Sequence, residues 1–126
     1  MTTITPFLMF PGTAEAAMRL YTGLFADAEI LAMTHYPEGT VMHATFRLLG
    51  QQFHCIDSNI EHEFTFTPAI SFSVSCDSEA EIDRLFAELS VDGAVLMPLA
   101  AYPFAAKYAW VQDRFGVSWQ LSLDVV

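Results

Sequence analysis

The segment Gly50-Gln51-Gln52-Phe53-His54 returns later in the chain, in altered form, as Gly116-Val117-Ser118-Trp119-Gln120. Both copies place an aromatic residue shortly after the glycine and a polar residue directly after the aromatic one. A second pair of similar segments, Leu24-Phe25-Ala26 and Leu85-Phe86-Ala87, lies earlier in each half and in the same order. Self-similarity that keeps its order along the chain indicates an internal duplication. We therefore expect two modules with the same arrangement of elements.

The first half predicts a strand, a helix and three further strands. Residues 7–10 form a short apolar run that ends at Pro11-Gly12, which is typical of a buried strand followed by a turn. Thr13 is expected to cap the helix that follows. The apolar residues at helical spacing on one side of this helix are Ala17, Leu20, Tyr21 and Leu24. Strands are then predicted at residues 28–36, 41–49 and 52–56.

The second half predicts the same order of elements. Its first strand shows an alternating pattern made of Ile70, Ser71, Phe72, Ser73, Val74 and Ser75. Ser78 and Glu81 form a capping box that starts a helix over residues 78–90. The side chains expected to be buried on this helix are Ile82, Leu85, Phe86 and Leu89. Three more strands are predicted at residues 95–99, 107–113 and 117–123, with a loop at Tyr102-Pro103-Phe104.

These patterns predict an α+β fold in which two βαβββ modules form a cupped mixed sheet. The modules span about residues 1–58 and 68–126, and the polar segment between them has no periodicity. A chain of 126 residues fits a single domain, so both modules are expected to share one folded unit. Clefts between modules are common ligand sites.

The polar side chains concentrate on one face of the predicted sheets. In the strand at 41–49, the apolar face consists of Met42, Ala44, Phe46 and Leu48, and the other face of His43, Thr45 and Arg47. The whole polar set turned away from the helices is His43, Thr45, Arg47, His54, Ser71, Ser73, Gln120 and Ser122. Two interpretations remain open at this point: a ligand-binding face, or ordinary solvent-facing positions of an antiparallel sheet.

The composition restricts the partners. Fifteen acidic against five basic residues give a net charge of −10, which repels nucleic acid and anionic membranes. The hydrophobic fraction is 53% and the charged fraction only 16%, so the surface is expected to carry fewer charged residues than average. We therefore expect a homodimer that covers part of the apolar surface, with neither nucleic acid nor membrane as a partner.

Cys55 and Cys76 are the only cysteines, and they lack CxxC spacing. Each lies in an apolar strand pattern, which favours two buried free thiols, although the sequence leaves a disulfide open. The start Met1-Thr2-Thr3-Ile4 shows no basic region followed by an apolar run. The expected location is the cytoplasm.

Several segments together resemble a known family. They are Ile4-Thr5-Pro6-Phe7-Leu8, Ala14-Glu15-Ala16-Ala17-Met18, Phe64-Thr65-Phe66-Thr67-Pro68-Ala69-Ile70-Ser71, Tyr102-Pro103-Phe104 and Trp110-Val111-Gln112-Asp113-Arg114-Phe115-Gly116-Val117-Ser118-Trp119-Gln120-Leu121. With the βαβββ order they resemble the glyoxalase, bleomycin resistance and dioxygenase superfamily, or vicinal oxygen chelate fold, and within it the PhnB-like group. The resemblance implies paired modules around a pocket, often in a dimer. It does not imply methyl transfer, the activity in a common label of this group, because the chain has no glycine-rich nucleotide loop with a following acidic residue.

The resemblance also implies four positions where metal-dependent members hold their ion. In this chain they carry Thr5 or Phe7, His54, Ala69 or Ser71, and Gln120. Only His54 is a usual ligand of a divalent metal, and a catalytic site needs at least three good donors. We therefore expect no tightly held metal and no other cofactor. A two-histidine site with His43 is the alternative in which a divalent metal binds.

The candidate site combines both modules. His54 is the candidate acid, base or sole metal ligand, and Gln120 is its hydrogen-bonding partner across the cleft. The residues expected to bind the ligand are His43, Thr45, Ser71, Ser73, Tyr108 and Trp110. Tyr108 and Trp110 provide flat walls or pack in the core. Cys55 faces the helix, which argues against a Cys-His nucleophile.

Two functions are compatible with this site. The first is an enzyme, or a former enzyme, acting on a small organic substrate. The second is a non-catalytic module that sequesters an aromatic or cationic compound, as resistance proteins of this fold do. His35 and His62 are expected to be exposed, and Asp57 to lie at the rim of the cleft.

Overall fold

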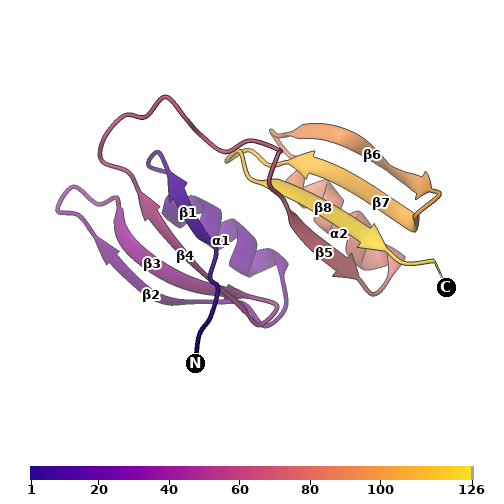
Figure 1. Ribbon diagram of the computed structural model, residues 1–126, viewed down its shortest axis with the longest axis horizontal. Helices are drawn as coiled ribbons and strands as arrows, with labels where there is room; N and C mark the ends of the chain where they lie inside the picture. Colours follow the sequence, from indigo (N-terminus) through magenta and orange to yellow (C-terminus); the bar gives the residue numbers. More distant parts are fainter. Residues whose placement is uncertain (126) are drawn as a thin grey trace. The chain divides into compact units, whose positions relative to one another are not determined.

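The computed structural model describes residues 1–125 and divides into two compact units, Met1–Glu63 and Phe64–Val126. Each unit contains one helix and one four-stranded sheet, in the order strand, helix and three strands (Figure 1). The predicted α+β class and the repeated βαβββ modules are therefore confirmed. Within residues 1–125, no helix is long and apolar enough to cross a membrane.

The first unit has a mixed sheet with strand order β1-β4-β3-β2. Its elements are β1 (Phe7–Phe10), α1 (Ala14–Leu24), β2 (Glu29–His35), β3 (Val41–Leu48) and β4 (Gln51–Asp57). β1 pairs with β4 in parallel, whereas the other neighbours are antiparallel. Because β1 and β4 are the first and last strands of the unit, this parallel pair brings its two ends together.

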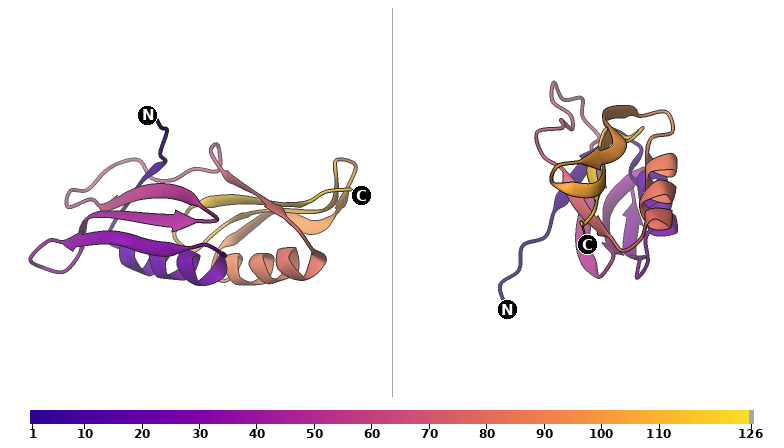
Figure 2. Two further views of the ribbon diagram at one scale, coloured as in Figure 1. Left: turned by 90° about the horizontal axis from the view of Figure 1, so that it is seen from below. Right: turned by 90° about the vertical axis from the view of Figure 1, so that its right-hand side faces the viewer.

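The second unit repeats this topology with strand order β5-β8-β7-β6. Its elements are β5 (Phe72–Cys76), α2 (Glu79–Leu89), β6 (Ala94–Tyr102), β7 (Ala105–Gln112) and β8 (Ser118–Leu123). β5 pairs with β8 in parallel, as β1 does with β4. In both units the helix lies against one face of its own sheet (Figure 2).

The core of each unit lies between the helix and the sheet. In the first unit, Tyr21 of α1 is buried on this side, and Phe46 and Phe53 stack with ring centroids 5.1 Å apart. In the second unit, Leu85 of α2 and Trp119 of β8 are buried. Alternation along the strands places the other side chains on the helix-free face.

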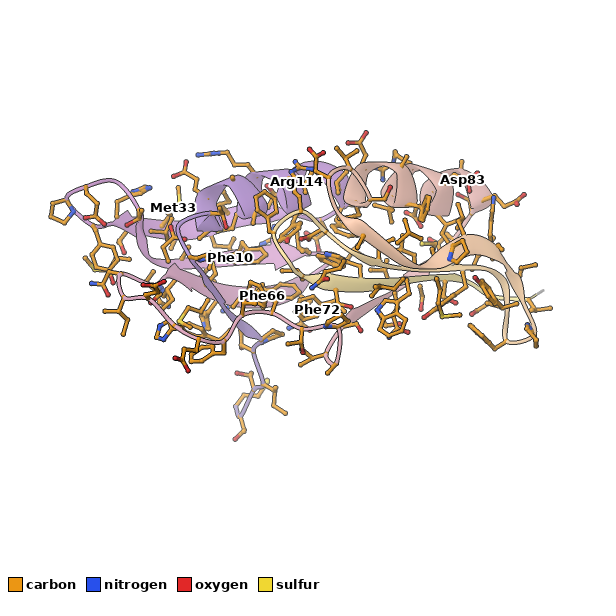
Figure 3. All side chains as sticks on the ribbon, turned by 90° about the horizontal axis from the view of Figure 1, so that it is seen from above. Phe10, Met33, Phe66, Phe72, Asp83 and Arg114 are labelled. Carbon is orange, nitrogen blue, oxygen red and sulfur yellow. The ribbon has the colours of Figure 1, made fainter. Side chains whose placement is uncertain are left out.

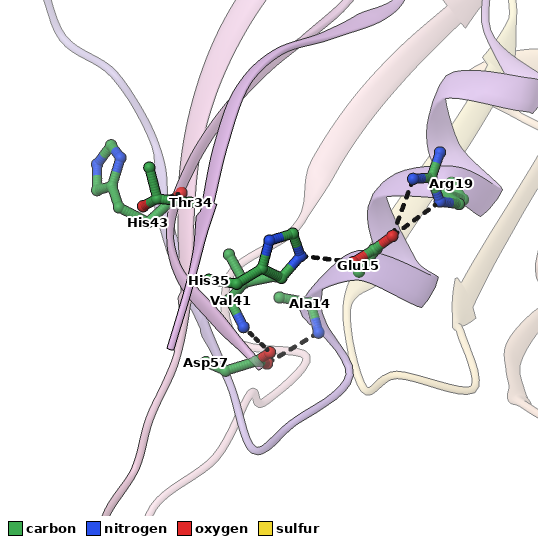
Figure 4. A network of polar contacts seen from close by, with 8 residues as sticks. All are labelled: Ala14, Glu15, Arg19, Thr34, His35, Val41, His43 and Asp57. Atoms are coloured by element: carbon green, nitrogen blue, oxygen red, sulfur yellow. Dashed lines mark hydrogen bonds and ion pairs between the residues drawn. The ribbon is translucent and has the colours of Figure 1, made fainter. Parts of the chain in front are cut away.

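A buried carboxylate caps α1. Asp57 is 2% exposed; its Oδ1 accepts hydrogen bonds from the backbone N–H groups of Gly12 (3.0 Å) and Ala14 (2.9 Å), the second of which is drawn in Figure 4. Its Oδ2 accepts one from the Val41 N–H at 2.9 Å. Thr13 occupies the N-cap position as predicted, but its side chain makes no capping hydrogen bond. A carboxylate at the positive end of the helix dipole provides the cap instead. The prediction of Asp57 as a rim residue was wrong.

A second buried carboxylate organises the turn between β7 and β8. Asp113 is 3% exposed; its Oδ1 accepts from the N–H groups of Phe115 (2.8 Å) and Val117 (3.1 Å). Its Oδ2 accepts from the indole Nε1–H of Trp119 at 2.8 Å. Gly116 has a φ of +93°, which favours glycine at this position of the turn.

The alternation predicted for β3 fails at Met42. Thr34 lies opposite His43 and His35 lies opposite Val41, so Met42 has no partner on β2. This β-bulge turns Met42 to solvent, where it is 44% exposed, although it was predicted on the helix side. From Ala44 onward the predicted faces hold.

The capping box of α2 is confirmed, since Ser78 Oγ accepts from the Glu81 N–H at 3.2 Å. Ile82, Leu85 and Leu89 are buried as predicted, whereas Phe86 is only half-buried. Asp83, labelled on α2 in Figure 3, pairs with Lys107 of β7 at 2.6 Å. Ile70 was predicted within the first strand of this unit, but it precedes β5 and is 73% exposed.

β6 is longer than predicted. It continues to Tyr102 and is followed by a tight turn into β7, where the sequence predicted a loop. Pro98 lies within β6, which is an edge strand, so its missing N–H need not break the sheet.

We predict that Asp57→Asn destabilises the protein more than Thr13→Ala. The amide presents one acceptor oxygen and one NH2 group, which cannot accept a hydrogen bond, so at least one buried N–H loses its partner at a cost of about 1 to 3 kcal/mol. Thr13→Ala is expected to change the free energy of unfolding by less than about 0.5 kcal/mol. Urea denaturation of the three proteins measures both values, and equal losses would show that Asp57 is not the cap.

Candidate functional site

The helix-free face of the first sheet gathers two histidines. His54 on β4 lies in register with Phe7 on β1 and with Thr45 on β3. The Thr45 Oγ1 is 3.0 Å from the His54 Nδ1. The rings of His43 and His54 have centroids 5.3 Å apart, and the Phe7 ring lies 6.1 Å and 6.0 Å from them. The structure thus brings together three predicted site residues and adds Phe7.

This face lies on the opposite side of the sheet from the cap of α1. Figure 4 shows His43 on the other side of the strands from Ala14 and Asp57. His54 is half-buried, whereas His43 is exposed. Because Thr45 occupies the Nδ1 of His54, the Nε2 is the ring nitrogen left to exchange a proton or to bind a ligand. Arg47 belongs to the same face, but its Nε donates to Asp27 Oδ1 at 3.0 Å.

The helix-free face of the second sheet carries a chain of hydrogen bonds. The Tyr108 hydroxyl donates to the Gln120 Oε1 at 2.8 Å, and the Gln120 Nε2 donates to the Ser71 Oγ at 3.1 Å. Trp110 donates its Nε1–H to the Ser118 Oγ at 2.8 Å. Ser73 lies in register with Gln120 and is exposed. Four predicted site residues are therefore linked or adjacent, and Trp110 lies in register with Gln120 on the neighbouring strand.

An aromatic cluster borders this hydrogen-bond chain. Tyr102 and Phe104 stack with centroids 5.5 Å apart, and both meet Tyr108 edge-on, at 5.6 Å and 4.9 Å. Burial raises the pKa of Tyr108, and the neighbouring Tyr102 adds to this, so the phenol stays protonated as a donor. The candidate site did not include Tyr102 or Phe104. Their position just before the strand of Tyr108 was the signal that could have found them.

The donor set does not fit a tightly bound divalent metal. Residues 1–125 contain no group of three or more His, Cys, Asp or Glu side chains arranged to hold an ion. The β1 neighbour of His54 is Phe7, which has no donor atom. The Gln120 Oε1, its only ligating atom, already accepts from Tyr108.

Two further histidines have hydrogen-bond partners of their own. The exposed His35 donates from its Nε2 to the Glu15 Oε1 at 2.9 Å, and hydrogen bonds from His35 and then Arg19 lower the pKa of that carboxyl group (Figure 4). His62 was predicted to be exposed, but it is half-buried and hydrogen-bonded to Ser58 Oγ at 2.8 Å.

Both cysteines are buried free thiols, as predicted. Burial, with a smaller contribution from Asp57, raises the pKa of Cys55 to about 12. Burial likewise raises the pKa of Cys76 to about 11. Neither thiol is a nucleophile at neutral pH.

His54 and Gln120 belong to different units, so their predicted meeting across one cleft stays a prediction.

Comparisons with known proteins agree with this topology. The family model of 3-demethylubiquinone-9 3-methyltransferase matches residues 2–122. The solved PhnB protein from Bacillus cereus is 55% identical, with a TM-score of 0.95 over 97% of this chain and 99% of that chain. Protein PA1353 from Pseudomonas aeruginosa is 28% identical, with a TM-score of 0.83 over 98% of each chain.

A glyoxylase/bleomycin resistance protein/dioxygenase domain from Frankia sp. EAN1pec shares the fold at 17% identity, with a TM-score of 0.71 over 99% of this chain and 93% of that chain. No curated protein matches the chain. The chain therefore belongs to the PhnB-like family named for 3-demethylubiquinone-9 3-methyltransferase.

Proposed function

We propose that this protein binds a small organic molecule on the helix-free faces of its sheets. One observation carries the proposal: on both faces, polar side chains hydrogen-bond to one another in ordered pairs and chains, such as Thr45 with His54 and Tyr108 with Gln120. Ordinary solvent-facing side chains do not require such hydrogen bonds to one another, because water molecules satisfy their donors and acceptors. The links hold the side chains in fixed orientations, as a binding site requires.

Methyl transfer is not part of the proposal. Doubly wound folds hold a nucleotide at a glycine-rich turn that opens a helix N-terminus. The turn before α1 contains Gly12, but the N–H groups at this helix start are bound to Asp57. The turn before α2 is Asp77-Ser78, without glycine, and Ser78 caps that helix.

Whether the protein performs chemistry depends on His54. Its Nδ1 contact with Thr45 fixes the ring and leaves the Nε2 free to act as a general acid or base. This supports the enzyme interpretation, with Gln120 as a hydrogen-bonding partner if the two residues share one cleft. The alternative is a module that binds or sequesters its ligand without changing it.

We further propose a homodimer located in the cytoplasm. Large apolar side chains that support a covered surface include Ile60, Ile70, Val91 and Val95, which are 66%, 73%, 49% and 48% exposed. The two free thiols support a reducing compartment.

Binding is expected to depend on His54 but not on His35. We predict that a compound selected from a library by protein NMR will bind His54→Ala at least about five-fold more weakly, which corresponds to roughly 1 kcal/mol. His35→Ala is the matched control, because it removes an exposed histidine outside both faces. Equal affinities for both variants, or bound compounds that shift only resonances of the helix side, would refute the proposed site.

Purified protein is expected to contain far less than one equivalent of Ni, Mn, Fe or Zn per chain, since His54 lacks two further donors. Elemental analysis after expression with added metal measures this content. One equivalent that disappears in His54→Ala would overturn the prediction and favour a metal-dependent enzyme.

Light scattering at micromolar concentration is expected to give about twice the mass of one chain, because a second copy would cover the exposed apolar residues. A monomer would show that these residues remain in contact with water.

A further inference from the structure

Two hydrogen bonds on the helix-free face of the second sheet form a chain that runs in one direction. Tyr108 donates to the Gln120 Oε1, and the Gln120 amide then donates to the Ser71 Oγ. Gln120 therefore accepts through its side-chain oxygen and donates through its side-chain nitrogen. Within residues 1–125, the Ser71 hydroxyl hydrogen has no hydrogen-bond acceptor. The second hydrogen of the Gln120 side-chain amide has none in this range either. The chain ends in two adjacent donors.

Within β5, β7 and β8, no charged side chain lies on this face. Its members on or beside β5, β7 and β8 are Ser71, Ser73, Ser75, Tyr108, Trp110, Gln112, Ser118, Gln120 and Ser122. None of them is acidic or basic, although the whole chain has a net charge of −10. The one lysine of β7, Lys107, points to the helix side and pairs with Asp83 and Glu79.

We infer that this face recognises an uncharged, flat organic molecule through a carbonyl-type oxygen, which accepts hydrogen bonds from Ser71 and Gln120. The inference rests on the proposed function and names the class of its ligand. Trp110 lies beside Gln120 on the neighbouring strand and Phe104 packs edge-on against Tyr108, so both provide aromatic surface suited to the flat part of the molecule. Tyr108 is a positioning residue, since its hydroxyl fixes which end of the Gln120 amide points toward Ser71.

Charged ligands fit this face poorly. An ion placed against it would lose hydration without meeting an opposite charge, which is unfavourable in a partly buried site. A neutral carbonyl oxygen loses less hydration and meets two donors. Hydrogen bonds in a chain also strengthen one another, so the Ser71 hydroxyl is a better donor than an isolated serine.

Four probes of similar size test the class of ligand: acetophenone, isopropylbenzene, benzoate and N-methylbenzylammonium. Titration of the ¹⁵N-labelled full chain, followed at the Trp110 indole and Gln120 amide resonances, gives each affinity. Acetophenone is expected to bind about three- to ten-fold more tightly than each of the others, the range of one or two net hydrogen bonds. Tyr108→Phe and Ser71→Ala are expected to remove the advantage of acetophenone over isopropylbenzene while leaving isopropylbenzene binding unchanged.

Tyr102→Phe is the matched control, because it removes a hydroxyl from the same aromatic cluster that donates to the Pro98 carbonyl and not to Gln120. This variant is expected to keep the advantage of acetophenone. A charged probe that binds as tightly as acetophenone would overturn the inference and leave the proposed function standing. The inference would also be overturned, with the proposed function left standing, if Tyr108→Phe weakened isopropylbenzene binding as much as acetophenone binding. That result would show that the Tyr108 hydroxyl has a purely structural role. If none of the four probes shifts these resonances, the proposed function fails at this face together with the inference.

Discussion

The carboxylate of Asp57 connects three parts of the first unit that are distant in the sequence. Lying at the end of β4, it binds backbone N–H groups at the start of α1 and at the start of β3. Without it, these N–H groups would be left in or near the core with no acceptor, which costs about 1 to 3 kcal/mol each. The second unit also contains a buried carboxylate with three donors, Asp113, but at the turn between β7 and β8. Each unit therefore depends on one internal anion, placed at a different point of the same topology.

The two faces of each sheet carry different kinds of side chain. The helix side contains the apolar core, including both cysteines, whose pKa values are raised by burial. The opposite side contains the hydrogen-bonded polar groups of the candidate site. Outside the bulge at Met42, the division follows from strand alternation, so a single residue inserted into β4 would exchange His54 with its buried neighbours.

Much of the fold could be predicted from the sequence because its signals are local. The capping box at Ser78 and the duplicated glycine-aromatic segments depend on residues a few positions apart, and the structure agrees with both. The cap of α1 could not be predicted, since Asp57 reaches that helix from another strand. The exposed Met42 was missed because a bulge leaves no mark in the alternation of residue types. For the candidate site, the sequence identified which residues share a face. It could not show the Tyr108 to Gln120 to Ser71 hydrogen bonds, which depend on side-chain conformation.

The parallel pairing of the first and last strand of each unit has a consequence for the order of folding. Strands β2, β3 and β4 are joined by short connections, so their pairing closes small loops. The pairing of β1 with β4 has the largest sequence separation in the sheet, because α1, β2 and β3 lie between these strands in the chain. It can therefore form only after the intervening elements have come together. The same holds for β5 and β8. Phe7, which contacts both histidines, is thus placed beside them by the pairing that we expect to form late, so the histidine face is completed only when the whole unit has folded.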